Sequence, residues 1–270
     1  MASIIQISDT HFGTEQPPVV DALVNMVHAQ NPDLVVLSGD ITQRARSRQF
    51  HAARQFADSL HARNLLTIPG NHDIPLFDLF TRIFRPYAKY QRLFGDDLEP
   101  GFDSESLRVI TVKTTRRYRH VDGEVSPEQI ERVANLLKAA KPQQLRLVVT
   151  HQPVCVIRPQ DEENLLRRHE AAIRAWSAAG ADIIMGGHIH LPYVCALHES
   201  LAGLPCRAWA VQAGTAVSSR IRHEAGNSVN LIRYDSASNT LKIEQWNYQI
   251  DHRCFAIART HELDREKHGR

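Results

Sequence analysis

The stretch LTIPGNHDIP, residues 66–75, joins an apolar run to a turn that is crowded with polar side chains. The run looks like the end of a buried strand, and the Pro-Gly pair after it is typical of a turn. Asn71, His72 and Asp73 then follow without a spacer. Stability alone does not require three such side chains on one turn, whereas a site that binds a metal or transfers protons does.

Two similar apolar runs precede this one. We expect strands at 3–8, 33–39 and 64–69, with amphipathic helices at 19–30 and 47–62. This β-α-β-α-β order is typical of an α/β sheet flanked by helices. Ligand sites of open α/β sheets lie at the carboxyl ends of strands. The polar residues that follow the three runs are therefore expected to come together.

The segment at 76–102 is rich in aromatic residues and arginine, and we interpret it as a helical insert or cap. The chain that follows it is expected to consist mostly of strands. Strands are expected at 106–114, 145–151, 181–188, 193–199, 206–214, 228–235 and 240–248, and helices at 126–140 and 162–179. Because short strands follow one another, we expect antiparallel pairing in this half. The sequence predicts one domain over 1–250, with two sheets packed face to face and helices outside, and a polar tail at 251–270.

The composition is that of a globular protein, with 43% hydrophobic and 23% charged residues. A net charge of +2 disfavours a nucleic-acid scaffold, so no stable nucleic-acid partner is expected. No apolar run is long enough to span a bilayer, and a signal peptide is not expected, which favours a cytoplasmic protein. The four cysteines lack CxxC spacing, and we expect free buried thiols rather than two disulfides.

Eight polar residues stand at the ends of successive apolar runs: Asp9, His11, Asp40, Asn71, His72, His151, His188 and His190. Each has an ordinary explanation when taken alone. An aspartate after a strand often caps a helix, and a single histidine is more often a hydrogen-bonded core residue than a ligand. Eight of them in one order are hard to assign to turns.

The chemistry of this set indicates a metal site. It contains no cysteine, so a thiolate zinc site is excluded, and imidazole, carboxylate and amide oxygen suit Mn²⁺, Fe or Zn²⁺. The ligands suffice for two ions, which lie about 3.5–4 Å apart in such sites and need a bridging group such as a carboxylate. An ion pair of this kind clamps a phosphoryl group and makes hydroxide available near neutral pH.

The order SDTHF, SGD, PGNHD, THQP and GGHIH, between residues 8 and 190, resembles the calcineurin-like metallophosphoesterase superfamily. The resemblance implies a four-layer α/β/β/α sandwich of two mixed sheets with a dimetal site at strand ends. It implies one metal held by Asp9, His11 and His190, a second held by Asn71, His151 and His188, and Asp40 as the bridge. It also implies that His72 lies outside the metal shell, beside the scissile phosphate, where Asp73 either orients it or shapes the turn.

One motif departs from the family pattern. Members often have two histidines before the proline of the fourth motif, whereas this chain has His151, Gln152 and Pro153. The first histidine is the implied ligand, so the metal site is retained. An outer-shell role for the second position is in doubt.

Within the superfamily, ISDTHFG, PGNHDIP and AGTAVSSRIR most resemble the bacterial branch of class III cyclic nucleotide phosphodiesterases and glycerophosphodiesterases. This implies a metal-dependent phosphodiesterase that uses a metal-bridging hydroxide. It also implies two bound metal ions, for which Mn²⁺ or Fe is expected and Zn²⁺ is the alternative. Cyclic nucleotides are the first expected substrate, ahead of other small diesters. A pyrophosphatase or diesterase acting on a lipid or nucleotide-lipid, and a non-specific phosphatase, stay as alternatives, and a homodimer is left open.

Other features allow two explanations each. The arginines at 44–48, 116–119 and 220–222 either contact an anionic substrate or are simply solvated. The aromatics Phe77, Phe80, Phe84, Tyr87 and Tyr90 either line a base or acyl pocket or pack the insert. Two rival functions are a metal-binding scaffold, against which the intact His72 argues, and a DNA nuclease, against which the lack of a long basic stripe argues.

Overall fold

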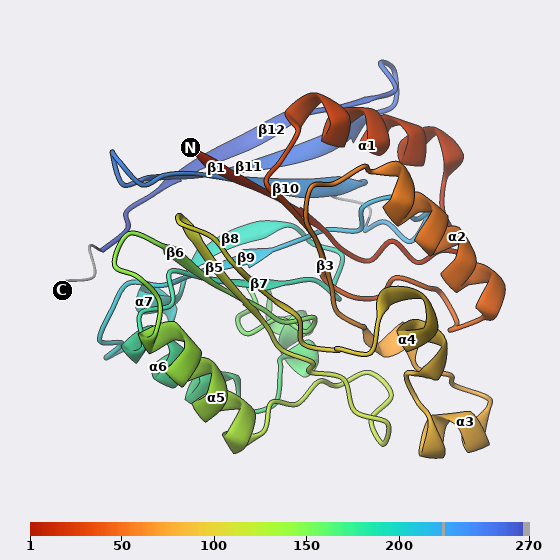
Figure 1. Cartoon of the computed structure of the whole chain (residues 1–270), viewed down its shortest axis with the longest axis horizontal. Helices are drawn as coiled ribbons and strands as arrows, with labels where there is room; N and C mark the ends of the chain where they lie inside the picture. The colour runs from red at the N-terminus through yellow and green to blue at the C-terminus, as the bar shows by residue number, and fades with distance from the viewer. Residues whose placement is uncertain (223–224, 267–270) are drawn as a thin grey trace.

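The computed structural model describes residues 1–222 and 225–266 of the 270-residue chain. Two six-stranded sheets pack face to face, and helices cover their outer faces (Figure 1). Both sheets contain parallel and antiparallel pairs. The predicted four-layer α/β/β/α sandwich of two mixed sheets is therefore confirmed.

The first sheet has the strand order β12-β11-β10-β1-β2-β3. Its strands are β1 (Ala2–Ile7), β2 (Leu34–Leu37), β3 (Leu65–Thr67), β10 (Ser228–Asp235), β11 (Thr240–Gln249) and β12 (Cys254–Leu263). β1, β2 and β3 run parallel and are connected by α1 (Pro17–Gln30) and α2 (Ser47–Ser59). The β-α-β-α-β order predicted for the first seventy residues is confirmed.

The second sheet has the order β4-β5-β6-β7-β9-β8. Its strands are β4 (Gly101–Asp103), β5 (Leu107–Thr111), β6 (Leu145–Val149), β7 (Ile183–Gly186), β8 (Tyr193–Ala196) and β9 (Trp209–Gln212). β5, β6, β7 and β9 run parallel, so the predicted antiparallel pairing of this half is wrong for them. The reason is that α5 (Pro127–Lys138) and α6 (His169–Ala178) follow β5 and β6, and a helical crossover returns the chain to start the next strand in the same direction.

Strand alternation divides the apolar residues among the layers. In β1, Ile5 and Ile7 pack against α1 and α2, whereas Ile4 faces the other sheet. In β6, Leu147 faces the space between the sheets and Val148 packs toward α5 and α6. Since successive side chains of a strand point to opposite faces, apolar residues at every position predict burial on both faces.

The segment 76–102 contains α3 (Leu79–Phe84) and α4 (Ala88–Phe94), as its predicted helical character requires. On α4, Tyr90 is fully buried and donates a hydrogen bond to Thr67 Oγ1 at 2.7 Å. α3 projects from the body of the molecule (Figure 1), and Phe80 and Phe84 on it are 73% and 65% exposed. Packing therefore explains Tyr90, whereas the α3 aromatics remain at the surface.

The C-terminal segment differs from the expected polar tail. Residues 254–263 form β12, which pairs antiparallel with β11 along its whole length. As the edge strand of the first sheet it exposes most of its side chains, and Phe255 and Leu263 are among its few buried residues. A strand with one exposed face needs few buried apolar residues, so its sequence is mostly polar and resembles that of a tail. The last four residues of the predicted tail lie outside the described residues.

Candidate dimetal site

The eight predicted polar residues lie on loops that leave the carboxyl ends of β1, β2, β3, β6 and β7. Parallel strands end at the same edge of a sheet, and the two sheets are stacked so that these edges meet. A buried polar bridge ties them there: Gln6 Nε2 in β1 donates a hydrogen bond to the Gly186 carbonyl in β7 at 2.9 Å. Loops distant in sequence are thereby held at one place.

The backbone of these loops is unusual. Asp9, His11, Asp40, His188 and His190 have φ between 43° and 74°, in the left-handed region. This region is costly for residues other than glycine, and aspartate and histidine are among the types that tolerate it best. Strained backbone persists where the surrounding structure enforces it and gathers at functional sites. Five such residues in one place therefore mark this region as a site.

Glycine is required where two of these loops approach each other. A Cβ on Gly39, whose φ is 101°, would collide with the His151 ring. A Cβ on Gly70 would collide with the backbone and carboxylate of Asp40. Gly70 of the opening motif thus lets the turn that carries Asn71 pack closely against Asp40.

A first cluster consists of Asp9, His11 and His190, which can each offer one ligand atom within 4.8 Å of the others. The Nε2 atoms of His11 and His190 are 3.0 Å apart. Asp9 Oδ1 lies 3.8 Å from the former and 3.4 Å from the latter. The other oxygen of Asp9 accepts a hydrogen bond from the His188 amide at 2.9 Å, which orients the carboxylate.

A second cluster consists of Asp40, His151 and His188, again within 4.8 Å. Asn71 joins it, because its Oδ1 lies 3.2 Å from His151 Nε2. Asp40 Oδ1 is 3.3 Å from His151 Nε2, and Asp40 Oδ2 is 3.7 Å from His11 Nε2 in the first cluster. The two oxygens of Asp40 thus face different clusters.

The donor set fits metal ions. Within the described residues, Asp9 Oδ1 and His188 Nδ1 are buried polar atoms without a hydrogen-bond partner. Buried polar atoms are rarely left unpaired in proteins, and each such atom calls for an explanation. Both belong to the clusters of imidazole and carboxylate donors, which suit Zn²⁺, Fe or Mn²⁺. Metal coordination accounts for both atoms.

Electrostatics favour a cation at this place. Burial raises the pKa of the Asp9 carboxyl, but the adjacent His190 imidazole and the charge of His151 outweigh it and lower the value to about 2. Burial likewise opposes ionisation of Asp40, yet His151 and His72 hold its pKa well below the ordinary value. Burial and the charge of His151 lower the pKa of His188 to about 4, so this imidazole is neutral and free to act as a ligand.

His72 lies at the edge of the clusters. Its backbone N–H donates to Asp40 Oδ1 at 2.8 Å, and its Nδ1 donates to the Gln43 carbonyl, also at 2.8 Å. Arg220 Nη1 is 3.3 Å from His72 Nε2. One nitrogen of the ring is therefore anchored to the backbone, and the other faces the site. Geometry also brings His72 within 4.8 Å of ligand atoms of His11 and Asp40.

Asp73 shapes the turn. Its carboxylate accepts hydrogen bonds from the backbone N–H groups of Ile41, Thr42 and Gly70, at 3.0, 2.7 and 2.9 Å, and from the Thr42 hydroxyl at 2.8 Å. Among the described residues it makes no hydrogen bond to the His72 ring. The alternative in which Asp73 orients His72 directly is thus not supported, because three of the four donors belong to Ile41 and Thr42 on the loop after β2 and the fourth is the Gly70 amide of its own turn.

Two further residues reach the site. The guanidinium of Arg220 lies 3.3 Å from His11 Nδ1 and donates to Gln43 Oε1 at 3.2 Å. The sequence marks Arg220 as one of several arginines, and nothing in the sequence distinguishes Gln43. Arg222, which the same motif contains, instead forms an ion pair with Asp161 at 2.9 Å.

Gln152, at the position where the fourth motif departs from the family pattern, has a structural role. Its Oε1 accepts a hydrogen bond from the Thr114 hydroxyl at 2.5 Å, and its Nε2 donates to the Val121 carbonyl at 3.2 Å. These two contacts hold the arginine-rich loop at 113–123 next to His151, which is a candidate metal ligand. An amide replaces the second histidine without disturbing the ligand next to it.

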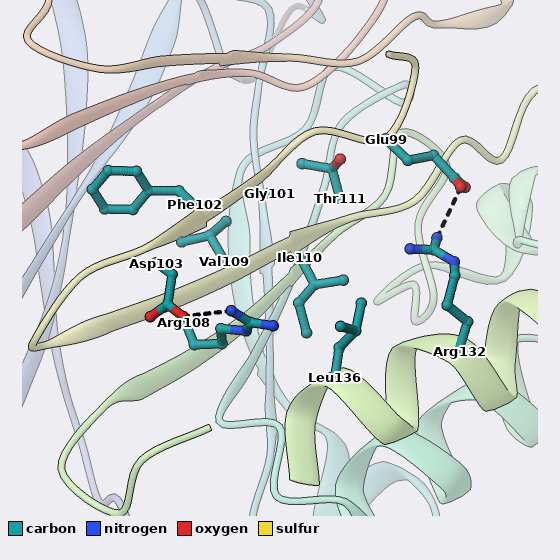
Figure 2. Close-up of a pocket in the computed structure, with 10 residues that line it drawn as sticks. All are labelled: Glu99, Gly101, Phe102, Asp103, Arg108, Val109, Ile110, Thr111, Arg132 and Leu136. Carbon is teal, nitrogen blue, oxygen red and sulfur yellow. Dashed lines mark hydrogen bonds and ion pairs between the residues drawn. The ribbon is translucent and has the colours of Figure 1, made fainter. Parts of the chain in front are cut away.

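A separate pocket of about 300 Å³ lies at β4, β5 and α5 (Figure 2). Its charged side chains are paired with one another, Glu99 with Arg132 at 2.9 Å and Asp103 with Arg108 at 2.6 Å. The ten residues that line it do not include any of the eight candidates. This pocket is therefore separate from the strand-end clusters.

Two proteins named as glycerophosphodiester phosphodiesterases are similar in sequence to this chain. Glycerophosphodiester phosphodiesterase GpdQ of Enterobacter lignolyticus is 37% identical over 123 residues, which are 42% of this chain and 43% of that protein. Probable glycerophosphodiester phosphodiesterase GpdQ of Arcobacter nitrofigilis is 24% identical over 200 residues, 69% of this chain and 71% of that protein. The chain thus matches less than half of the length of the first relative.

A solved structure shares the fold. Purple acid phosphatase PPD1 from yellow lupin (Lupinus luteus) seeds superposes with a TM-score of 0.68 at 14% identity, over 98% of this chain and 54% of that chain. At this identity the likeness shows the fold alone. None of the helices in the described ranges combines the length and the apolar character needed to span a bilayer.

The sequence model of one family, described as calcineurin-like phosphoesterase, matches residues 2–192, which contain all eight candidate residues. The order of the motifs, the sandwich of two sheets and the clusters at the strand ends agree with this match. The chain therefore belongs to the calcineurin-like phosphoesterase family, and it carries metal-ligand clusters of the kind that a dimetal phosphoesterase needs.

Proposed function

We propose that this chain is a metal-dependent phosphodiesterase that hydrolyses small phosphodiesters at the dimetal site. One observation carries the proposal: the two ligand clusters share Asp40, one of whose oxygens faces His11 and the other His151. A shared carboxylate is what holds two ions at the separation needed to act on one phosphoryl group.

The ligand assignment follows the two clusters. We assign one ion to Asp9, His11 and His190, a second to Asn71, His151 and His188, and Asp40 to both. When bound, such a pair supplies Lewis-acid stabilisation of phosphoryl oxygens and a nucleophile derived from water. The nitrogen-rich and oxygen-rich donor set favours Mn²⁺ or Fe, with Zn²⁺ as the alternative.

His72 is proposed as the general acid. Its Nδ1–H donates to the Gln43 carbonyl, so Nε2 faces the site, and it is the imidazolium form of the ring that holds a proton on Nε2 for transfer. A histidine held in this way can protonate the leaving oxygen as the phosphoester bond breaks. Asp73 serves indirectly, by fixing the turn on which His72 stands.

Arg220 is proposed to bind the phosphate of the substrate. Its guanidinium lies beside both His11 and His72, at the mouth of the clusters, and arginine suits the planar recognition of phosphate oxygens. A phosphodiester carries a single negative charge and gains less from metal ions than a monoester dianion. Contacts beyond the metal centre, such as Arg220, should therefore matter more for diesters.

The substrate class rests on the relatives. Both curated relatives bear names of glycerophosphodiester phosphodiesterases. The match to the first of them covers only 43% of that protein. We therefore propose glycerophosphodiesters as the first class to test, followed by cyclic nucleotides. A second candidate is a diester or diphosphate with an acyl group, which the exposed Phe80 and Phe84 on α3 favour.

The test compares bis(p-nitrophenyl) phosphate with p-nitrophenyl phosphate at one pH and one Mn²⁺ load. We expect a higher kcat/KM for the diester. An equal or higher value for the monoester refutes the diesterase assignment and makes the protein a general phosphatase. A panel of glycerophosphodiesters, cyclic nucleotides and acylated diphosphates then ranks the natural classes, and hydrolysis of the synthetic diester alone rejects all three.

A further inference from the structure

Two cysteines meet outside the metal clusters. Cys155 Sγ and Cys195 Sγ are 3.2 Å apart, although the residues are 40 positions apart in the chain. Cys155 lies on the loop after β6, four residues beyond His151, and Cys195 lies in β8, five residues beyond His190. Both are free thiols and only partly buried.

We propose that Cys155 and Cys195 are a redox modification site, at which a reversible intramolecular disulfide forms. The sulfur atoms need to approach by only about 1 Å to reach the S–S bond length of about 2.05 Å. The two segments are already held together, because the Tyr193 hydroxyl donates to the Cys155 carbonyl at 2.6 Å. Ser200 Oγ lies 3.2 Å from Cys195 Sγ and adds a polar neighbour.

The two thiols are not equivalent. Hydrogen bonds from Cys155 and Ser200 stabilise the thiolate of Cys195 and lower its pKa to about 6, although burial acts in the opposite sense. The same pairing, together with burial, raises the pKa of Cys155. Because the thiolate is the nucleophile of thiol–disulfide exchange, Cys195 is the attacking residue and Cys155 the resolving one.

The reaction balances with a small disulfide as oxidant. The Cys195 thiolate attacks one sulfur of the reagent, which forms a mixed disulfide and releases one reagent thiolate. Cys155 then attacks the Cys195 sulfur, forms the protein disulfide and releases the second reagent thiolate, which takes up the proton from Cys155. Two protein thiols are oxidised, and one reagent disulfide is reduced to two thiols.

A cavity gives such a reagent access. It has a volume of about 230 Å³ and is lined by Cys155 and Ser200, both of which contact Cys195 Sγ, together with Glu162, His169 and Glu170. Cys195 lies beside this lining and is itself partly exposed. The acidic residues favour a cationic reagent over an anionic one. Cystamine, a small disulfide with two ammonium groups, is therefore the probe of choice. A bond at this place would also tie the β6 loop that carries His151 to the strand that follows His190.

The experiment uses the folded, Mn²⁺-loaded chain with the substitutions Cys206→Ser and Cys254→Ser, which leave the pair as its two cysteines. After cystamine treatment, the remaining thiols are alkylated and the peptides are identified by mass spectrometry. We expect a peptide with Cys155 linked to Cys195, no bound cysteamine, and full return of both thiols with dithiothreitol.

Single substitutions test the two roles. Adding Cys155→Ser should stop the reaction at a mixed disulfide on Cys195, and adding Cys195→Ser should slow modification of Cys155 at least about tenfold, since the low-pKa thiol is gone. The proposal is overturned if both thiols of the folded protein stay alkylatable, if both carry cysteamine without linking, or if the link forms only in denaturant. None of these outcomes depends on phosphodiesterase activity.

Discussion

The Nδ1 atom of His72 lies 2.8 Å from the backbone carbonyl of Gln43, so the ring is fixed by the main chain of a neighbouring loop. This contact leaves Nε2 of His72 as the ring atom that faces Arg220 and the clusters. A metal ligand and a general acid would both stand at this distance from the clusters. The consequences of removing the ring differ between the two roles.

Replacing His72 with alanine should preserve metal content and lower turnover by roughly 10²–10⁴-fold, the usual contribution of a positioned acid or base. The loss should be smaller for p-nitrophenyl esters than for alkyl esters, because a good leaving group needs little protonation. Elemental analysis and kcat on both substrate types check this. His51→Ala, an exposed histidine on α2, is the matched control. A fall in metal content would show that His72 is a ligand.

Replacing Arg220 with alanine should reduce kcat/KM for diesters by about 10–100-fold, which corresponds to a charged hydrogen bond of about 1.5–3 kcal/mol. Lysine at the same position should restore part of the activity, since it keeps the charge but not the planar fork. Arg63→Ala serves as an exposed control. Steady-state kinetics that are unchanged in Arg220→Ala would remove this residue from the phosphate site.

Much of the fold and of the site follows from the sequence, for a physical reason. Each of β1, β2, β3, β6 and β7 is an apolar run ending in polar residues, and parallel strands bring such ends to one edge. Asp9, Asp40 and His151 are therefore placed by local signals alone. The left-handed backbone of Asp9 and Asp40 is consistent with the residue types found there.

Other features depend on contacts that residue types do not reveal. The tautomer of His72 is set by a main-chain carbonyl, which every residue has, so nothing marks Gln43 in the sequence. The parallel pairing of β6 with β7 depends on the crossover through α6, and a list of short strands does not show it. The sequence of β12 resembles a polar tail, because an edge strand buries few apolar residues and Phe255 is one of those few.

Asp73 provides a test of stability. Its buried carboxylate holds two loops through four hydrogen bonds, and alanine would leave the backbone N–H groups of Ile41, Thr42 and Gly70 without their acceptor. We expect Asp73→Ala to lower the free energy of unfolding by about 3–5 kcal/mol, and asparagine to cost less because it retains one acceptor. Urea unfolding measures both. A loss below about 1 kcal/mol for alanine would contradict the turn-fixing role.

The ligand assignment predicts unequal effects of two substitutions. Asp40→Ala should abolish binding of both ions, because the two oxygens of Asp40 face different clusters. Asn71→Ala should chiefly weaken one ion, since Asn71 Oδ1 lies 3.2 Å from His151 Nε2 in the second cluster. Metal analysis after dialysis against a weak chelator distinguishes them. Equal losses from the two variants would reject the assignment of Asp40 as the bridge.

The central claim is that two metal ions, held on either side of Asp40, hydrolyse a phosphodiester together. The most direct measurement titrates the metal-free chain with Mn²⁺ and records bound metal and bis(p-nitrophenyl) phosphate hydrolysis in the same samples. The account predicts that activity rises mainly as the second equivalent binds and levels off at two ions per chain. Full activity at one bound ion, or activity that persists in the metal-free chain, would contradict it.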